Sequence, residues 1–141
     1  MTIHTIDGRP ALRFERRLPH PPERVWRAVT DPAELGQWYP LRVTELDPRP
    51  GGRLVFDDGA DGVITGEITD FEPPRLFAFD EHDPEGRGRA FNDHARIELH
   101  PDAQGCLLVF THVFADATNA ESYSRGWEEC LDALVTALDA G

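Results

Sequence analysis

Apolar and polar residues alternate along several segments of the chain, with the period of two that is typical of half-buried β-strands. In segment 11–18, apolar Leu12, Phe14 and Leu18 are interspersed with charged residues. Six further segments with strand-like patterns follow residue 41 and are joined by short links rich in Gly, Pro and Asp. The predicted strands are 11–18, 42–46, 53–56, 62–71, 76–81, 91–100 and 106–114. Consecutive strands with short links predict an antiparallel meander.

Two short helices are predicted between the first strand and the others. Segment 20–23 contains two prolines, which a first helical turn tolerates because its N–H groups have no helical partners. At the second start, Asp31 can cap the helix, Pro32 suits its first position, and Glu34 can reach back to the cap. This second helix is expected to end near Trp38, because prolines and glycines follow.

A long helix is predicted at the carboxy-terminal end of the chain. Thr118, followed three places later by Glu121, forms a capping box that marks the start of the helix. Apolar residues then recur at steps of three and four, which places them on one face. These residues are Tyr123, Trp127, Leu131, Leu134 and Leu138.

Composition narrows the possible partners. The 141 residues carry 14 basic and 26 acidic side chains, a formal net charge of -12. This is the wrong sign for neutralising nucleic-acid phosphates or anionic lipid heads, so neither nucleic acid nor a membrane surface is an expected partner. No segment has the apolar core of a signal peptide or a membrane span, which predicts a cytoplasmic protein. Length and composition predict one domain over residues 1–141.

Several motifs resemble those of the START-like, or SRPBCC, superfamily. Residues 22–32 with Leu35 and Trp38 resemble its opening, 47–52 its glycine turn, and 66–76 with Pro73-Pro74 its next corner. Gly126-Trp127 and the leucines that follow resemble its closing helix. The resemblance covers nearly the whole chain and is closest to the branch named after activators of the Hsp90 chaperone ATPase. Asp80 and Cys106 depart from the pattern, standing where the family commonly has an aromatic residue and a threonine.

The resemblance implies an α+β helix-grip fold in which a curved antiparallel sheet, in the order β-α-α-β6-α, wraps around the carboxy-terminal helix. Members of the superfamily bind lipids, hormones, polyketides or other apolar ligands in a cavity, and a few are cyclases or hydrolases. The resemblance therefore implies a pocket between sheet and helix. Fold alone does not determine an activity.

The hairpin at residues 100–105 predicts which side chains face this pocket. A four-residue loop at 101–104 would pair Asp93 with His112 on an otherwise apolar face. A carboxylate beside an imidazole in a partly dry cavity would favour the charged imidazole, could fix one tautomer, and could let His112 donate to a ligand. The alternative is a solvated structural pair at the rim of the sheet, since a one-residue slip would turn both residues outward.

The candidate ligand-binding residues combine this pair with nearby apolar and aromatic positions. For each apolar or aromatic residue the alternative is simple core packing, because strand and helix stripes exist mainly to be buried. The full set is Trp38, Phe56, Ile64, Asp93, Phe110, His112, Tyr123 and Trp127.

The remaining motifs indicate no metal and no cofactor. The six histidines lack metalloprotease spacing, the two cysteines form no paired motif, and no nucleophile elbow or phosphate-binding loop is present. No catalytic residue is assigned. The polar, Gly-rich segment 83–89 is the candidate lid.

Three functions remain open at this level. The first is binding of a small apolar molecule, oriented by Asp93, His112 or Tyr123. The second is a cofactor-independent cyclase or dehydratase that uses the same pocket. The third is a chaperone-interacting module, which is less favoured because the chain lacks the additional amino-terminal domain of the eukaryotic activators.

Overall fold

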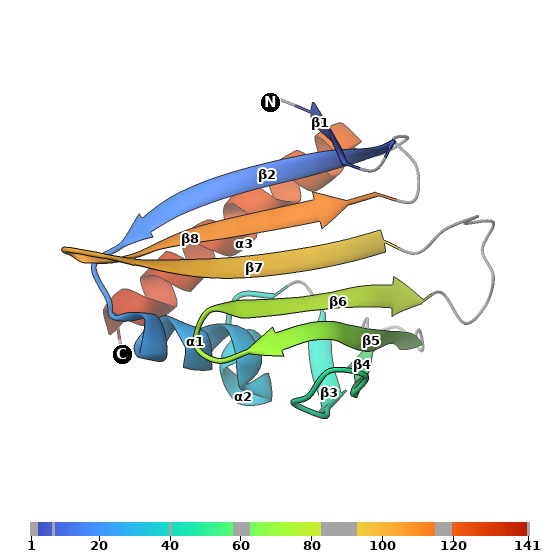
Figure 1. Cartoon of the computed structure of the whole chain (residues 1–141), viewed down its shortest axis with the longest axis horizontal. Helices are drawn as coiled ribbons and strands as arrows, with labels where there is room; N and C mark the ends of the chain where they lie inside the picture. Colours follow the sequence, from blue (N-terminus) through green and yellow to red (C-terminus); the bar gives the residue numbers. More distant parts are fainter. Residues whose placement is uncertain are drawn as a thin grey trace.

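The protein has an α+β fold in which a curved antiparallel sheet holds a long helix on one face (Figure 1). The computed structural model describes residues 3–6, 8–39, 41–57, 63–82, 93–114 and 120–140, without the side chains of residues 3 and 120–123. The elements in chain order are β1 (Ile3–Ile6), β2 (Arg9–Leu18), α1 (Pro22–Thr30), α2 (Pro32–Leu35), β3 (Arg42–Leu46), β4 (Arg53–Asp57), β5 (Val63–Glu72), β6 (Leu76–His82), β7 (Asp93–Asp102), β8 (Gly105–Val113) and α3 (Ala120–Ala140).

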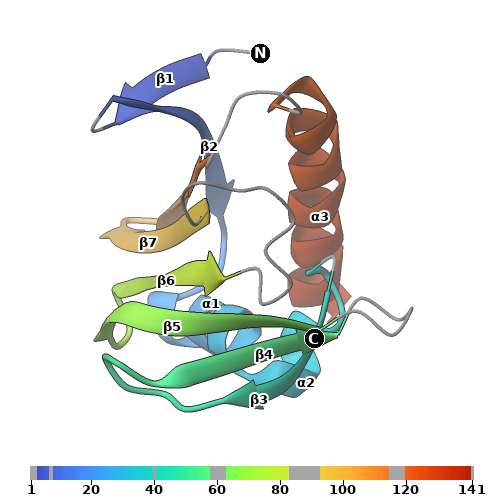
Figure 2. The same cartoon turned by 90° about the vertical axis from the view of Figure 1, so that its right-hand side faces the viewer.

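The eight strands described form one sheet in the order β1-β2-β8-β7-β6-β5-β4-β3. All neighbours are antiparallel, and the segment from β3 to β8 is the predicted meander. The sheet bends around α3, which lies along its concave face, while α1 and α2 lie beneath its lower half (Figure 2). This is the helix-grip fold that the family resemblance implied.

The first edge strand, β1, is absent from the sequence prediction. It pairs with the start of β2, so that Ile3 lies opposite Leu12 and Ile6 opposite Arg9. Its four residues are too few to show alternation. The signal available was Asp7-Gly8, a dipeptide common in tight hairpins. Gly8 has a φ of +79°, a conformation that glycine adopts without strain.

The predicted pairing of β7 with β8 is wrong by two residues. Asp102 lies opposite Gly105 and Ala95 opposite His112, so the turn contains two residues where four were expected. Asp102 stabilises this shorter turn, because its Oδ1 accepts a hydrogen bond of 2.9 Å from the backbone N–H of Gln104. A shift of two preserves the face of every side chain, so Asp93 and His112 still point to the concave side.

The apolar core fills the space between the concave face and the helices. The described part of the predicted α3 stripe, Trp127, Leu131, Leu134 and Leu138, is buried against it. The predicted capping residue Thr118 lies outside the described residues. At α2, Asp31 makes no side-chain capping bond, and Glu34 accepts a hydrogen bond from Arg24 at 2.7 Å where a bond back to the cap was expected. The side-chain caps predicted for α2 are therefore absent, although Asp31 and Pro32 take the predicted positions, and α2 ends at Leu35 and not near Trp38.

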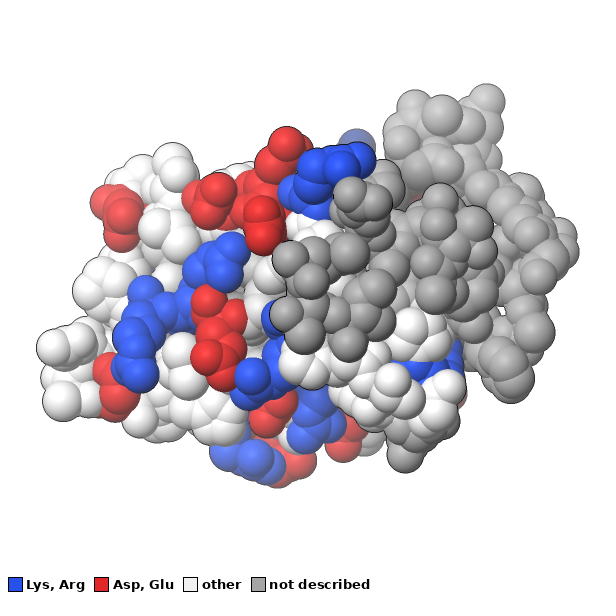
Figure 3. Space-filling model, turned by 90° about the horizontal axis from the view of Figure 1, so that it is seen from above, with Lys and Arg blue, Asp and Glu red and all other residues white. Residues whose placement is uncertain are grey.

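Acidic and basic side chains alternate on the face seen from above, with no field of a single sign among the residues shown in colour (Figure 3). Oppositely charged side chains also pair at the surface, as Arg13 does with Glu15 at 2.7 Å. No described helix is long and apolar enough to cross a membrane.

Candidate functional site

Five side chains form a polar and aromatic group on the concave face, which we call the concave cluster: Tyr39, Glu81, Asp93, His112 and Trp127. Three of them stand near strand ends, because β6 ends at His82, β7 begins at Asp93 and β8 ends at Val113. Because these strands are antiparallel, the end of β6, the start of β7 and the end of β8 lie at the same end of the sheet, far from the turn at 103–104. Trp127 reaches the cluster from α3, and Tyr39 from the segment after α2.

A buried hydrogen-bonded chain links β7, β8 and α3. His112 Nε2 lies 2.9 Å from Asp93 Oδ2, and the indole N–H of Trp127 donates to His112 Nδ1 at 2.9 Å. Because Asp93 is not directly opposite His112, the contact is diagonal across the two strands, which long side chains can span. The imidazole also stacks on Phe114, with ring centroids 4.1 Å apart.

The hydrogen bonds of Asp93, His112 and Trp127 determine which nitrogen of His112 carries the proton. An indole N–H can only donate, so His112 Nδ1 must accept and the proton of the neutral ring resides on Nε2, facing Asp93. A second proton on Nδ1 would place two donors against each other. The geometry therefore fits the neutral imidazole, where the sequence suggested the charged one. It also engages both ring nitrogens within the protein, so donation to a ligand would require breaking one of these bonds.

A second polar pair adjoins the first. Tyr39 donates its hydroxyl hydrogen to Glu81 Oε1 at 3.1 Å, and Glu81 lies opposite Asp93 in the sheet. Burial, followed by the negative charge of Glu81 and its hydrogen bond, raises the pKa of Tyr39 well above its usual value, with smaller effects from Cys130 and Asp93. The phenol thus stays protonated and remains a donor. The sequence analysis did not identify Tyr39 or Glu81 as site residues. Glu81 could have been found, because it follows Phe77 and Phe79 at alternate positions of β6 and therefore shares their inner face.

Aromatic rings connect the predicted apolar residues to this cluster. Tyr39 stacks on Phe56 at 5.5 Å and lies 5.6 Å from the ring of Trp127, which in turn contacts Phe110 at 4.5 Å. Ile64 pairs with Phe56 across β4 and β5 and is partly buried. The structure thus brings together Phe56, Ile64, Phe110 and Trp127, which we call the apolar wall.

The other predicted residues lie elsewhere or are not described. Trp38 is buried beside Tyr39, at 5.5 Å, but turns its indole N–H to the carbonyl of Ala28, where it braces α1. The side chain of Tyr123 lies outside the described residues, as does the candidate lid at 83–89. Asp80 points to the convex face, where it pairs with His94, so this departure from the family pattern does not alter the concave side.

Among the described residues, Tyr39 lines an inner void and an open pocket. The inner void, of about 10 Å³, is apolar and is lined by Leu35, Tyr39, Val43, Leu54, Phe56, Phe77, Phe79 and Ile97. This is close to the smallest space that holds one water molecule. The open pocket, of about 570 Å³, lies between α2 and β3. Within the described part of the chain, no group of three or more His, Cys, Asp or Glu residues could hold a metal ion.

Comparison with known proteins agrees with this architecture. The family described as Activator of Hsp90 ATPase homolog 1-like protein matches residues 19–139. Protein CV1439 from Chromobacterium violaceum has a similar structure, with 27% identity and a TM-score of 0.77 over 91% of this chain and 96% of that chain. CalU16 from Micromonospora echinospora has 24% identity and a TM-score of 0.78 over 96% and 82%. MLL2253 from Mesorhizobium loti has 23% identity and a TM-score of 0.79 over 92% and 97%. No match is found among the curated proteins.

Proposed function

The chain belongs to the Activator of Hsp90 ATPase homolog 1-like family, and we propose that it binds a small apolar or amphipathic molecule between the concave face of its sheet and α3. The ligand would contact the apolar wall and be oriented by the concave cluster. No cofactor takes part.

The observation that carries this proposal is the buried chain Asp93–His112–Trp127 within an otherwise apolar wall. Burying a carboxylate and an imidazole costs desolvation free energy that an apolar core would avoid, so such a group adds little net stability. Ligand sites, in contrast, combine an apolar lining with a few fixed polar groups that set orientation and specificity. The concave cluster has this composition.

Each predicted residue has a distinct role in the proposal. Phe56, Ile64, Phe110 and Trp127 form the apolar wall, and Trp38 supports it from behind. Asp93 supplies a hydrogen-bond acceptor. His112 is a positioning residue, because its two nitrogens hold Asp93 and Trp127 in place. Tyr123 remains a candidate contact from the first turns of α3.

A competing function is an interaction module that uses its surface and needs no ligand. The packing around Tyr39 favours this alternative, because the void lined there by described residues measures only about 10 Å³. A ligand that enters this part of the core would have to displace side chains. The two functions differ in a measurable way, since an interaction module retains its packed core in the presence of apolar molecules.

The deciding experiment is a fluorescence titration with 1-N-phenylnaphthylamine, combined with native mass spectra recorded before and after organic extraction. We expect saturable one-to-one binding or a co-purified mass. His112→Ala and Trp127→Phe should weaken binding at least fivefold, because both disrupt the buried chain. Thr111→Val on the convex side of β8 is the matched control and should bind like the wild type.

Absence of both a bound mass and saturable binding in the wild type would contradict the proposal and favour the interaction module. His112→Ala leaves two buried groups unpaired and could impair folding. Trp127→Phe retains most of the ring and provides the second, milder test.

A further inference from the structure

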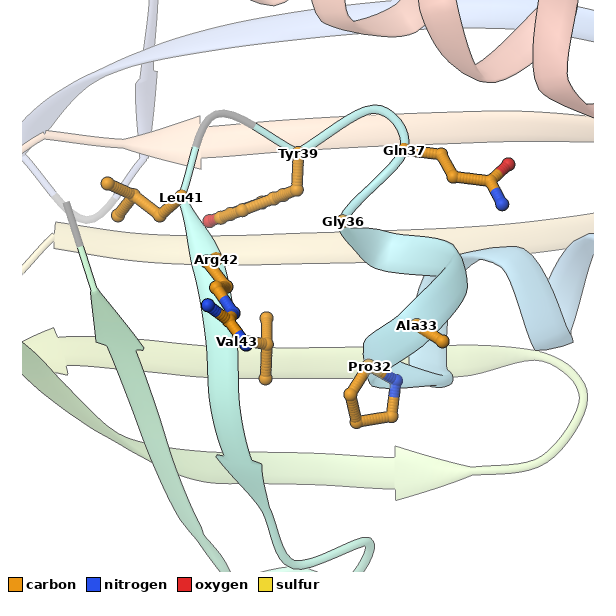
Figure 4. Close-up of a pocket in the computed structure, with 8 residues that line it drawn as sticks. All are labelled: Pro32, Ala33, Gly36, Gln37, Tyr39, Leu41, Arg42 and Val43. Atoms are coloured by element: carbon orange, nitrogen blue, oxygen red, sulfur yellow. The ribbon is translucent and has the colours of Figure 1, made fainter. Parts of the chain in front are cut away.

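Tyr39 lines both of the cavities described above, the inner void and the open pocket of about 570 Å³ between α2 and β3. Figure 4 shows the ring beside Leu41, with the pocket bordered by Pro32, Ala33, Gly36 and Gln37. Since Tyr39 and Val43 line both cavities, displacing the Tyr39 side chain would widen the space between them.

The contacts of Tyr39 are those that a binding site would offer a ligand. Its ring is stacked on Phe56, with centroids 5.5 Å apart and planes at 21°, and is flanked by Trp127 at 5.6 Å and Phe79 at 6.5 Å. Its hydroxyl donates a hydrogen bond to the Glu81 carboxylate at 3.1 Å. A planar ring bearing one hydroxyl thus has a complete set of partners here.

We propose that Tyr39 occupies the subsite of a hydroxyaromatic ligand, which displaces the tyrosine side chain into the pocket between α2 and β3 and takes over its place on Phe56 and Glu81. This inference rests on the proposed function and names the ligand class. The backbone of Tyr39 can stay fixed, since its N–H remains bonded to the carbonyl of Leu35 at 2.8 Å while the side chain rotates.

The polar groups select a hydroxyl over other ligand groups. An ionised Glu81 carboxylate only accepts hydrogen bonds, so it favours a ligand group that donates, such as a hydroxyl. The described inward N–H donors of His112 and Trp127 already have acceptors. A ligand that carries only a carbonyl would leave Glu81 without the donor that Tyr39 now supplies.

The direct test follows Tyr39 itself during binding. The chain contains two tyrosines, so protein labelled with 3-fluorotyrosine gives two fluorine resonances, and Tyr123→Phe assigns the one from Tyr39. Titration with 2-naphthol should move the Tyr39 resonance to the position of a solvent-exposed fluorotyrosine. The matched probe 2-methoxynaphthalene, which lacks the donor, should bind at least tenfold more weakly.

Variants test the two halves of the inference separately. Tyr39→Ala should bind 2-naphthol at least tenfold more tightly than the wild type, because no side chain has to be displaced. Glu81→Leu should reduce the preference for 2-naphthol over 2-methoxynaphthalene to less than twofold. Tyr39→Leu replaces the alanine variant if the latter does not fold, and the fluorine experiment on wild-type protein requires neither.

The outcomes separate this inference from the proposed function. Saturable binding of 1-N-phenylnaphthylamine with a stationary Tyr39 resonance on addition of 2-naphthol would overturn the role of Tyr39 and leave ligand binding intact. Equal affinity of Tyr39→Ala for both naphthalene probes would also overturn it, since that is the behaviour of an unspecific cavity. Failure of wild type and Tyr39→Ala to bind any of the three probes would overturn both proposals.

Discussion

Two pairs of aspartate and histidine lie on opposite faces of the same end of the sheet. The inner pair, Asp93 and His112, is on the concave face at 2.9 Å, with side chains only 7% and 5% exposed. The outer pair, Asp80 and His94, is on the convex face at 2.6 Å, with 34% and 23% exposure. His94 follows Asp93 directly in sequence, so alternation along β7 turns Asp93 to the buried concave face and His94 to the convex face, which borders water.

The inner pair differs further in having a third member. Trp127 donates to the remaining nitrogen of His112 and so determines its tautomer. The outer pair borders water, which can compensate either group when its partner is removed. The same two residue types therefore form a fixed polar unit when buried and a replaceable surface contact when exposed.

Removing the two histidines should show the largest contrast. His112→Ala leaves the Asp93 carboxylate and the Trp127 N–H buried without their partners, so we expect a loss of about 3–5 kcal/mol in the free energy of unfolding. His94→Ala should lose less than about 1 kcal/mol. Urea denaturation of both variants measures the difference. Equal losses would show that burial does not distinguish the pairs.

The third member of the inner unit can be removed alone. Trp127→Phe keeps most of the ring but removes the N–H, which leaves His112 Nδ1 a buried acceptor without its donor. We expect a loss of about 1–3 kcal/mol in the free energy of unfolding. Nitrogen NMR should show the Nε2-protonated tautomer of His112 in the wild type and a mixture in the variant. A wild-type ring protonated at Nδ1 would contradict the assigned hydrogen bonds.

Much of this contrast was predictable, because it depends on the period of two. Alternation along 91–100 and 106–114 assigned Asp93 and His112 to the inner face, and this survived a wrong turn length because the error was an even number of residues. An odd error would have assigned the wrong face, since a one-residue slip would turn these residues outward. The resemblance to a known superfamily added the curvature of the sheet and the place of the last helix.

The contacts that complete the site were not predictable from periodicity. Alternation tells which face a residue occupies, but not which turn of α3 crosses it, so the bond from Trp127 to His112 could not be foreseen. Tyr39 belongs to a segment without regular structure, where no period applies. Its insertion between Phe56 and Trp127 depends on how α2 docks against the sheet.

Tyr39, which adjoins the inner pair, should make the free energy of unfolding depend on pH in the alkaline range. The folded protein raises the pKa of Tyr39, so above about pH 10 the unfolded chain releases its phenolic proton while the folded chain keeps it. Stability from this group is therefore complete below pH 10 and decreases as pH rises further. Between pH 9 and 11 the wild type should lose about 1 kcal/mol more than Tyr39→Phe.

Denaturant unfolding of the wild type and Tyr39→Phe at several pH values measures this difference. Burial also raises the pKa of Cys106, to about 11, and that of Cys130, but both thiols are present in both proteins and cancel in the comparison. A Tyr39→Phe variant with the same alkaline loss as the wild type would contradict the assignment.

The smallest expected effect is the response of the two pairs to salt. Ions screen charges that border water far more than charges in the interior, so the outer pair should depend on ionic strength and the inner pair should not. Asp80→Asn should cost less than about 1 kcal/mol in low salt, and most of this cost should vanish in 1 M salt. Asp93→Asn should cost more, and by the same amount in both conditions, because the Asp93 carboxylate is buried in the concave cluster. Urea denaturation of both variants at the two salt concentrations measures this, with the wild type correcting for the general effect of salt. A salt-sensitive inner pair would mean that water reaches Asp93, and the concave cluster would then be an open rim contact of the same kind as its outer counterpart.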